Sequence, residues 1–402
     1  MNPTNPKEAG LAIFNIKPLD RFSGQSTSIK RPKEIACFSY DQERNFKLGD
    51  SSLAYYYPPS LPADLSAGFH SFQQLNDVPD EHLDALLETI IAQEKESGKK
   101  CDADIITWRG MMTKILTAPF STNDRFLRNE CDLLSGNNVR ILSEISIGYM
   151  ELTYPIRFIE ENNSYKNEQK KIQLQQRQMP QGMASQELMT YWGYKFEVLS
   201  VLRKSWDETS REEIEGRPNE VVNNSAQYCS VVKTGFGKTR LVLGGEVDAI
   251  WDCKPDRKED PIHWVELKTS AEIYNTRDNI KFQRKLLKFW AQSFLLGVAT
   301  IIIGFRDAQG NVNRLETLKT ASIPGKVMKE GRGFWDGNIC VNFTGEFLEW
   351  LKNIIQGDGV WRIRKLPKSD TIQIYKLEES GNGDILSQSF ITWRLSELGT
   401  KS

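Results

Sequence analysis

The chain has few histidines and no apolar stretch long enough to span a membrane. Only three of its 402 residues are histidine, and its six cysteines include no C-x-x-C pair, so a zinc site is not expected. No apolar run approaches the roughly 20 residues of a transmembrane helix. The first residues, MNPTNPK, are too polar for a signal peptide. We therefore expect an intracellular protein with reduced thiols and no membrane contact.

The chain also lacks an excess of positive charge. Its 52 lysines and arginines are balanced by 53 acidic residues, which gives a formal net charge of −1 and a pI of about 6.4. A general electrostatic coat for nucleic acid is therefore excluded, and any contact with RNA or DNA must be local. The composition, 39% hydrophobic and 26% charged, is ordinary for a globular protein. Because no long linker or repeat marks a boundary, we expect one domain over residues 1–402.

Acidic side chains are present inside an apolar run at residues 244–251, which read GGEVDAIW. Successive side chains of a β-strand point to opposite faces. Glu246 and Asp248 are therefore predicted to share one face of a strand. The intervening apolar residues, ending at Trp251, are predicted to share the buried face.

A second segment, HWVELKT at residues 263–269, repeats this pattern with Glu266 and Lys268. Residues 252–261 between the two segments are rich in charge and turn formers, so a hairpin is predicted. Pairing of the two strands would bring four ionisable groups onto one sheet face, where the carboxylates repel unless a cation or protonation compensates. The alternative is the solvated face of an antiparallel sheet, which shows the same alternation.

The order of these residues resembles a known superfamily signature. Asp248 followed by Glu266-x-Lys268 is similar to the Asp…(Asp/Glu)-x-Lys pattern of restriction-endonuclease-like nucleases. The resemblance implies that the carboxylates hold Mg²⁺ or Mn²⁺ and that the lysine positions or activates water.

An amphipathic helix is predicted after the second segment, at residues 279–297, ending near a glycine. Lys285, Lys288 and Gln292 form one polar stripe on it, since they are spaced by three and four residues. This stripe is either a solvated basic face or a surface that meets the substrate phosphate. The β-branched residues 298–305 that follow predict a buried central strand.

A second helix is predicted at residues 184–202, with Ser185 as its N-cap. Glu197 lies among apolar residues near its end. It is either a surface glutamate or a carboxylate that completes the metal site.

Two other features carry less weight. The GFGKT sequence at residues 235–239 is similar to a phosphate loop, but Val232 stands where that motif needs its first glycine, so a hairpin turn is predicted. The polar tract at 163–178 is predicted to be a mobile insertion or a solvated helix, with the guiding of RNA as a further alternative.

Five motifs in one order resemble the DXO family of RNA 5′-end decapping nucleases, whose fungal nuclear members partner an Xrn-type exoribonuclease. The motifs are WRGMMTKIL (108–116), GYKFE (193–197), EVD (246–248), ELK (266–268) and KFWAQS (288–293). Each is weak alone, but the order and spacing are specific. They cover the middle of the chain, and neither terminal portion contains a matching motif.

The resemblance implies a set of metal ligands. Glu197, Asp248, Glu266 and the backbone carbonyl of Leu267 would hold one Mg²⁺ or Mn²⁺ ion, and Glu246 would support a second. Two such ions, roughly 3.5–4 Å apart, activate water and stabilise the leaving oxygen in phosphoryl chemistry.

The resemblance also assigns the substrate contacts. Lys268 and Gln292 would contact the scissile phosphate or the attacking water. Arg109 would bind phosphate or sugar near the RNA 5′ end, in keeping with the bidentate geometry of a guanidinium.

The fold implied is an α/β fold with a mixed central β-sheet, a second smaller sheet and flanking helices, and a restriction-endonuclease-like catalytic core at about residues 105–305. The expected activity is hydrolysis of unmethylated caps, NAD caps or 5′-triphosphates on RNA, with a nuclear exoribonuclease as possible partner and a nuclear location, or a cytoplasmic one for a free-standing member. Two alternatives stay open: a non-catalytic module that stabilises the exoribonuclease, and a DNA endonuclease.

Overall fold

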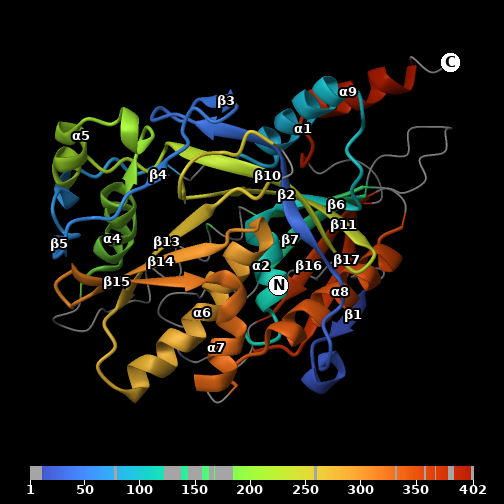
Figure 1. Cartoon of the computed structure of the whole chain (residues 1–402). Coiled ribbons are helices and arrows are strands. Elements are labelled where there is room, and N and C mark those ends of the chain that lie inside the picture. Colours follow the sequence, from blue (N-terminus) through green and yellow to red (C-terminus); the bar gives the residue numbers. More distant parts are fainter. Residues whose placement is uncertain are drawn as a thin grey trace, which may run out of the picture.

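The computed structural model of the chain contains two mixed β-sheets with helices packed on them (Figure 1). It describes residues 11–76, 79–121, 137–143, 156–162, 167, 184–257, 260–330, 333–356, 359–366, 368–378 and 384–399. The polar tract at 163–178 therefore lies outside the described residues, apart from Asn167. Within the described ranges, no helix is both long and apolar enough to cross a membrane.

The first sheet has ten strands, and parallel pairs at β6 and β8 and at β6 and β11 make it mixed. In spatial order the strands are β1 (Ala12–Asn15), β17 (Thr371–Glu378), β16 (Gly359–Lys365), β7 (Asn137–Ser143), β8 (Arg157–Glu161), β6 (Ile105–Trp108), β11 (Thr239–Glu246), β10 (Gln227–Phe236), β2 (Ile29–Tyr40) and β3 (Phe46–Leu48). The predicted hairpin turn at residues 235–239 joins β10 to β11 and contains Gly237 in a left-handed conformation (φ 56°), which confirms that prediction.

The second sheet has seven strands and is also mixed, since β13 pairs with β14 in parallel and with β12 in antiparallel orientation. In spatial order the strands are β5 (Ala63–Asp64), β15 (Asn311–Lys319), β14 (Thr300–Arg306), β13 (Trp264–Ala271), β12 (Ala249–Ile250), β4 (Tyr55–Tyr56) and β9 (Val201–Leu202). A mixed larger sheet, a smaller second sheet and flanking helices are the predicted arrangement.

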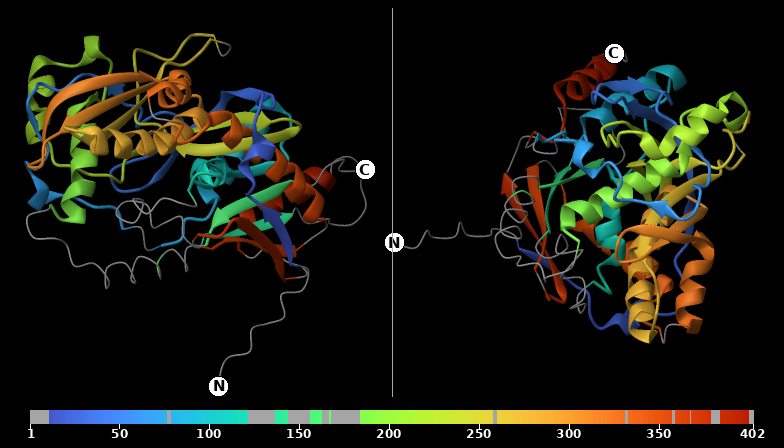
Figure 2. Two further views of the ribbon diagram at one scale, coloured as in Figure 1. Left: turned by 90° about the horizontal axis from the view of Figure 1, so that it is seen from below. Right: turned by 90° about the vertical axis from the view of Figure 1, so that its left-hand side faces the viewer.

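Helices cover both sheets. They are α1 (Asp84–Ser97), α2 (Arg109–Thr117), α4 (Gln186–Leu199), α5 (Arg211–Gly216), α6 (Thr276–Leu296), α7 (Ile323–Glu330), α8 (Gly337–Ile354) and α9 (Gln388–Gly399). Figure 2 shows α9, β16 and β17 at the end of the molecule away from α4 and α5. Helix α6 contacts strands of both sheets, which places it beside their junction.

The predicted helices and buried strand are confirmed. Helix α6 ends at Gly297, whose left-handed conformation (φ 74°) only glycine adopts readily. Helix α4 begins after Ser185, whose side chain accepts a hydrogen bond from the backbone of Leu188. Strand β14 is buried along nearly its whole length, as its β-branched sequence predicts.

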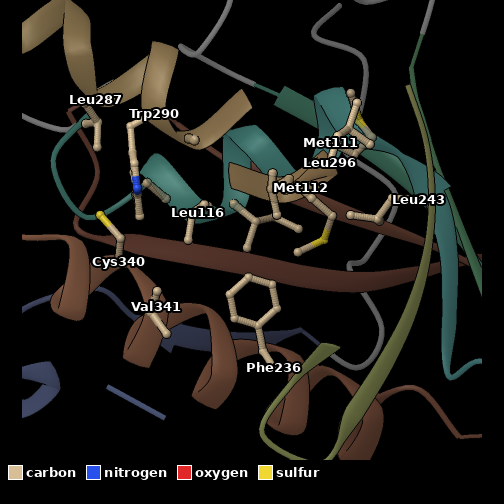
Figure 3. Close-up of a cluster of buried hydrophobic side chains, with 14 of the residues drawn as sticks. Met111, Met112, Leu116, Phe236, Leu243, Leu287, Trp290, Leu296, Cys340 and Val341 are labelled. Carbon is tan, nitrogen blue, oxygen red and sulfur yellow. The ribbon is translucent and has the colours of Figure 1, made fainter. Parts of the chain in front are cut away.

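The largest buried cluster fixes α2 relative to α6. Figure 3 shows Met111, Met112 and Leu116 of α2 beside Trp290 and Leu296 of α6, over strands β10 and β11 and helix α8. These side chains are almost completely buried. Because the core holds both helices, the first residue of α2 has a defined position next to the end of β11.

The prediction of a single strand over residues 244–251 is wrong. Strand β11 ends at Glu246 in the first sheet, and the chain then passes into β12 of the second sheet. The backbone N–H of Val247 still donates to Tyr228 in the first sheet, whereas that of Ile250 donates to Ala54 beside the second. Trp251 is 49% exposed and stacks on a tyrosine instead of entering the core. The hairpin itself is confirmed, since β12 pairs with β13.

A glycine in β14 positions helix α4. A Cβ atom on Gly304 would lie 2.7 Å from the ring of Phe196. Its absence lets the ring rest directly on the strand, so α4 lies close to the second sheet. Glu197, the next residue, is thereby held near the strands that carry the other acidic residues.

Candidate active site

Strand β13 carries the central ion pair of the site. Val265 and Leu267 are buried against the α4 side, as the alternation predicts. Glu266 is only 1% exposed on the other side, and its Oε1 lies 2.6 Å from Nζ of Lys268. A carboxylate buried this deeply needs such a partner, because transfer of an unpaired charge out of water is costly.

Asp248 joins this pair from the crossing between the two sheets. Its Oδ2 accepts a hydrogen bond of 2.7 Å from the backbone N–H of Leu267 and lies 3.7 Å from Nζ of Lys268. This hydrogen bond holds the crossing segment against β13. Lys268 is therefore shared between two carboxylates.

Arg109, the first residue of α2, approaches Glu266 from the first sheet. Its Nη1 lies 3.6 Å from Oε2 of Glu266, too far for a hydrogen bond. Within the described part of the chain, neither buried atom has a hydrogen-bond partner. Buried polar atoms are rarely left without partners, so these two mark a place where a ligand fits.

Two consecutive glycines bring Arg109 to this position. A Cβ atom on Gly245 would lie 2.9 Å from both Cβ of Arg109 and Cδ1 of Leu296, and one on Gly244 would lie 2.7 Å from the Trp108 ring. Trp108 and Arg109 therefore lie on opposite faces of β11, just before its acidic end. This explains the Gly-Gly pair that precedes Glu246.

The remaining carboxylates increase the negative charge of the cluster. Burial raises the pKa of Glu197 well above its usual value, and the nearby charges of Asp248 and Glu246 raise it further. Burial also raises the pKa of Glu246, although the charge of Arg109 opposes this. Protonation is therefore favoured on these groups when no cation is added.

The pKa of Asp248 shifts in the same direction, whereas that of Glu266 shifts in the opposite one. Burial, together with the charge of Glu266, raises the pKa of Asp248 to about 7. Burial would also raise the pKa of Glu266, but the Lys268 and Arg109 charges outweigh it and hold that pKa below the usual value. Lys268 and Arg109 thus keep Glu266 ionised, whereas burial and repulsion favour protonation of the other three carboxylates.

The carboxylate oxygens of the cluster are the type of ligand that binds a divalent cation. Oxygen ligands of this type suit Mg²⁺ and Mn²⁺, and such an ion would supply charge that one lysine cannot. Considering only the described residues, no three His, Cys, Asp or Glu side chains converge closely enough to hold an ion as they stand.

The sequence-predicted residues thus meet, with one exception. Arg109, Glu197, Glu246, Asp248, Glu266 and Lys268 form one electrostatically coupled group. Gln292 is partly exposed on α6, one turn before Leu296, and in the described part of the chain no hydrogen bond connects it to this group. Its predicted phosphate contact stays a prediction.

A cleft of about 700 Å³ opens from the acidic cluster. Glu197, Glu246 and Asp248 form part of its wall. Other parts of its wall, which sequence reasoning missed, come from three separate segments and include Gln42, Arg203, Lys204, Asn223 and Gln227. No spacing in the sequence relates these segments, so only the fold reveals them.

Comparison with known proteins identifies the family. A family model described as RAI1 like PD-(D/E)XK nuclease matches residues 30–133 and 144–391. The decapping nuclease RAI1 of Aspergillus fumigatus is 64% identical over 381 residues, which cover 95% of this chain and 98% of that protein.

Two solved structures are similar over nearly the whole chain. Candida albicans Rai1 in complex with pU5-Mn²⁺ has a TM-score of 0.81 and 30% identity, covering 94% of this chain and 98% of that one. Scheffersomyces stipitis Rai1 in complex with (3′-NADP)⁺ and calcium ion has a TM-score of 0.81 and 29% identity, covering 93% and 97%. The restriction-endonuclease-like fold and the predicted resemblance are confirmed: the chain belongs to the RAI1-like PD-(D/E)XK nuclease family.

Proposed function

We propose that this protein is a divalent-metal-dependent hydrolase of RNA 5′ ends, which removes unmethylated caps, NAD caps and pyrophosphate from 5′-triphosphates. The observation that carries the proposal is the cluster of four carboxylates with Lys268 and Arg109, three of whose members, Glu197, Glu246 and Asp248, line a cleft. The name of the A. fumigatus relative, and the pU5-Mn²⁺ and (3′-NADP)⁺ complexes of the two solved relatives, support it.

The residues suit this chemistry in distinct roles. Glu197, Asp248, Glu266 and the Leu267 carbonyl would hold one Mg²⁺ or Mn²⁺ ion, and Glu246 would support a second. When bound, these ions supply an activated water and charge stabilisation for the leaving oxygen.

The cationic side chains would bind the phosphate. Lys268 lies between two carboxylates and would add positive charge near the scissile phosphate as negative charge develops there. Arg109, whose Nη1 has no hydrogen-bond partner among the described residues, would bind a phosphate oxygen of the 5′ end. Gln292 would approach the same phosphate from α6.

Incubation of the purified protein with a panel of 5′ ends tests the proposal. The panel contains 5′-triphosphate, unmethylated-cap, methylated-cap and NAD-capped RNA and a matched DNA, each with Mg²⁺, Mn²⁺ or chelator. We expect RNA 5′ ends to be hydrolysed only with metal, and the Glu197→Ala/Asp248→Ala variant to be inactive. Equal activity in the double variant would refute the assigned site, and cleavage of DNA alone would favour the endonuclease alternative.

We further infer a nuclear location and a partner, an Xrn-type 5′-to-3′ exoribonuclease, as the family resemblance implies. Trp206, in the short 3₁₀ helix η5 (Trp206–Glu208), is 67% exposed, and such a tryptophan is a typical anchor of a protein interface. Arg203, Lys204 and Thr209 beside it line the cleft. A partner on Trp206 would therefore sit at the cleft rim, where it could receive the product.

The Trp206→Ala variant is expected to bind this exoribonuclease at least about 10-fold more weakly, as for loss of an interface hot spot. Titration calorimetry with the purified exoribonuclease measures the loss. Hydrolysis of 5′-triphosphate RNA by the variant alone should be unchanged. The control is Tyr274→Ala, which removes another exposed aromatic side chain (74% exposed) just before α6. Equal affinity of Trp206→Ala and the unmodified protein would contradict the assigned surface.

A further inference from the structure

A polar cluster beside Glu246 has no role in the mechanism above. It centres on Arg44, whose guanidinium lies over the Tyr40 ring at 3.7 Å and whose charge acts on Glu246. Nε and Nη2 of Arg44 donate to the two carboxylate oxygens of Glu81, at 2.9 and 2.7 Å. This bidentate pair occupies the Nε–Nη2 edge of the guanidinium, which would otherwise be available to bind a phosphate. Arg44 is therefore not itself a phosphate ligand.

The remaining nitrogen of Arg44 fixes the amide of Gln227. Nη1 donates to the Ser225 carbonyl at 3.1 Å and to Oε1 of Gln227 at 2.5 Å. Because arginine has no acceptor, the atom that faces it must be the amide oxygen. Nε2 of Gln227, with two N–H donors, is directed away from Arg44. In the part of the chain that is described, no side chain or carbonyl accepts a hydrogen bond from it.

The sheet register places Gln227 next to the acidic cluster. Cys229 of β10 is paired with Glu246 of β11, so Gln227, two residues earlier, lies on the same sheet face. Its distance from Glu246 is that of a diagonal neighbour, about 7–8 Å between Cα atoms. Continued pairing would place Asp248 opposite Gln227, but the chain has crossed to the second sheet there. Gln227 is thus left open to the cleft, which it lines.

We propose that Gln227 binds substrate, its Nε2 donating a hydrogen bond to a non-bridging phosphate oxygen of the RNA 5′ end, and that Arg44 is the positioning residue that holds the amide in this orientation. The proposal rests on the proposed function. A neutral donor suits this place: a lysine or arginine here would pair with Glu246 and compete with a bound metal ion, whereas an amide can bind an anion without doing so.

The Gln227→Glu variant tests the proposal. It keeps an acceptor for Arg44 but replaces the cleft-facing donor with a carboxylate oxygen, which repels phosphate. We expect KM for 5′-triphosphate RNA to rise about 10-fold or more, with kcat changed much less and the thermal midpoint not lowered. The control is Gln373→Glu. Oε1 of Gln373, on β17, accepts hydrogen bonds from Nε and Nη2 of Arg364, on β16, at 3.0 and 2.7 Å. The Gln373→Glu change should leave KM unaltered.

Two further variants separate orientation from charge. Gln227→Leu removes the donor without adding charge, so a smaller rise in KM is expected. Arg44→Lys keeps a positive charge but loses the planar fork, which frees the amide, so its KM should rise as in Gln227→Leu. An unaltered KM in both Gln227 variants, or an equal rise in Gln373→Glu, would overturn the proposal. Absence of hydrolysis by the unmodified protein would instead contradict the proposed function.

Discussion

The Lys268→Met variant is expected to lose about 10²- to 10³-fold in kcat/KM for 5′-triphosphate RNA and, without metal, to be less stable by about 3–5 kcal/mol. Lys268 lies between Glu266 and Asp248, with its Nζ 2.6 Å from the first carboxylate and 3.7 Å from the second. Among the described residues, its removal leaves Arg109 as the remaining cation that favours the ionised form of the buried Glu266. Steady-state kinetics and urea unfolding with chelator measure the two losses.

Metal should repair the stability loss of this variant but not its activity. Mn²⁺ bound to Glu266 and Asp248 would replace the missing positive charge, so the unfolding free energies of variant and unmodified protein should converge as Mn²⁺ is added. The control is Lys114→Met, which breaks a part-buried pair with Glu161 outside the cleft. Mn²⁺ should not restore its stability. A stable, metal-insensitive Lys268→Met protein would contradict the electrostatic account of the site.

The Glu197→Gln variant is expected to lose activity, as Lys268→Met does, but to be more stable than the unmodified protein when no metal is bound. We expect kcat/KM to fall at least about 10²-fold, because a metal ligand is removed, as for other groups that stabilise transition-state charge. The metal-free protein should become more stable near neutral pH, because burial and neighbouring carboxylates disfavour the ionised Glu197.

The raised pKa of Glu197 determines how the stability of the metal-free protein changes with pH. A carboxyl whose folded-state pKa is raised stabilises the fold below its unfolded value, here 4.5, and loses that contribution as pH rises through the folded-state pKa. In chelator, the unmodified protein should therefore lose stability over this range, and Glu197→Gln should lose less. Glu187→Gln, an exposed change in the first turn of the same helix, should show no such gain. Thermal unfolding at a series of pH values measures both.

The parts of the site that could be predicted are those that the spacing of polar and apolar residues along one strand or helix determines. The two-residue alternation in β13 predicted that Glu266 and Lys268 share a face, and the spacing in α6 predicted its polar stripe. The position of Glu197 on a capped helix was also predicted. These elements each bury one apolar face, so their own sequence determines how they lie.

The crossing between sheets could not be predicted in the same way. Residues 244–251 alternate like one strand, yet the chain changes sheet after Glu246, because its partners on either side come from distant segments. Tyr228 holds the first half and Ala54 and Leu267 hold the second. The Arg44–Gln227 contact was missed for the same reason, since 183 residues separate the two along the chain. Local pattern contains no information about such pairs.

The crossing at Val247 has a mechanical consequence. Glu246 ends a strand of the ten-stranded sheet, whereas Asp248 precedes a strand of the seven-stranded one. Two ions, one held by Asp248 and one supported by Glu246, would neutralise carboxylates on both sides of the boundary between the sheets, so sliding of one sheet against the other would disturb both ions. Binding of metal should therefore slow amide hydrogen exchange in strands of both sheets. The bound ions would then stabilise the packing of the two sheets as well as take part in catalysis.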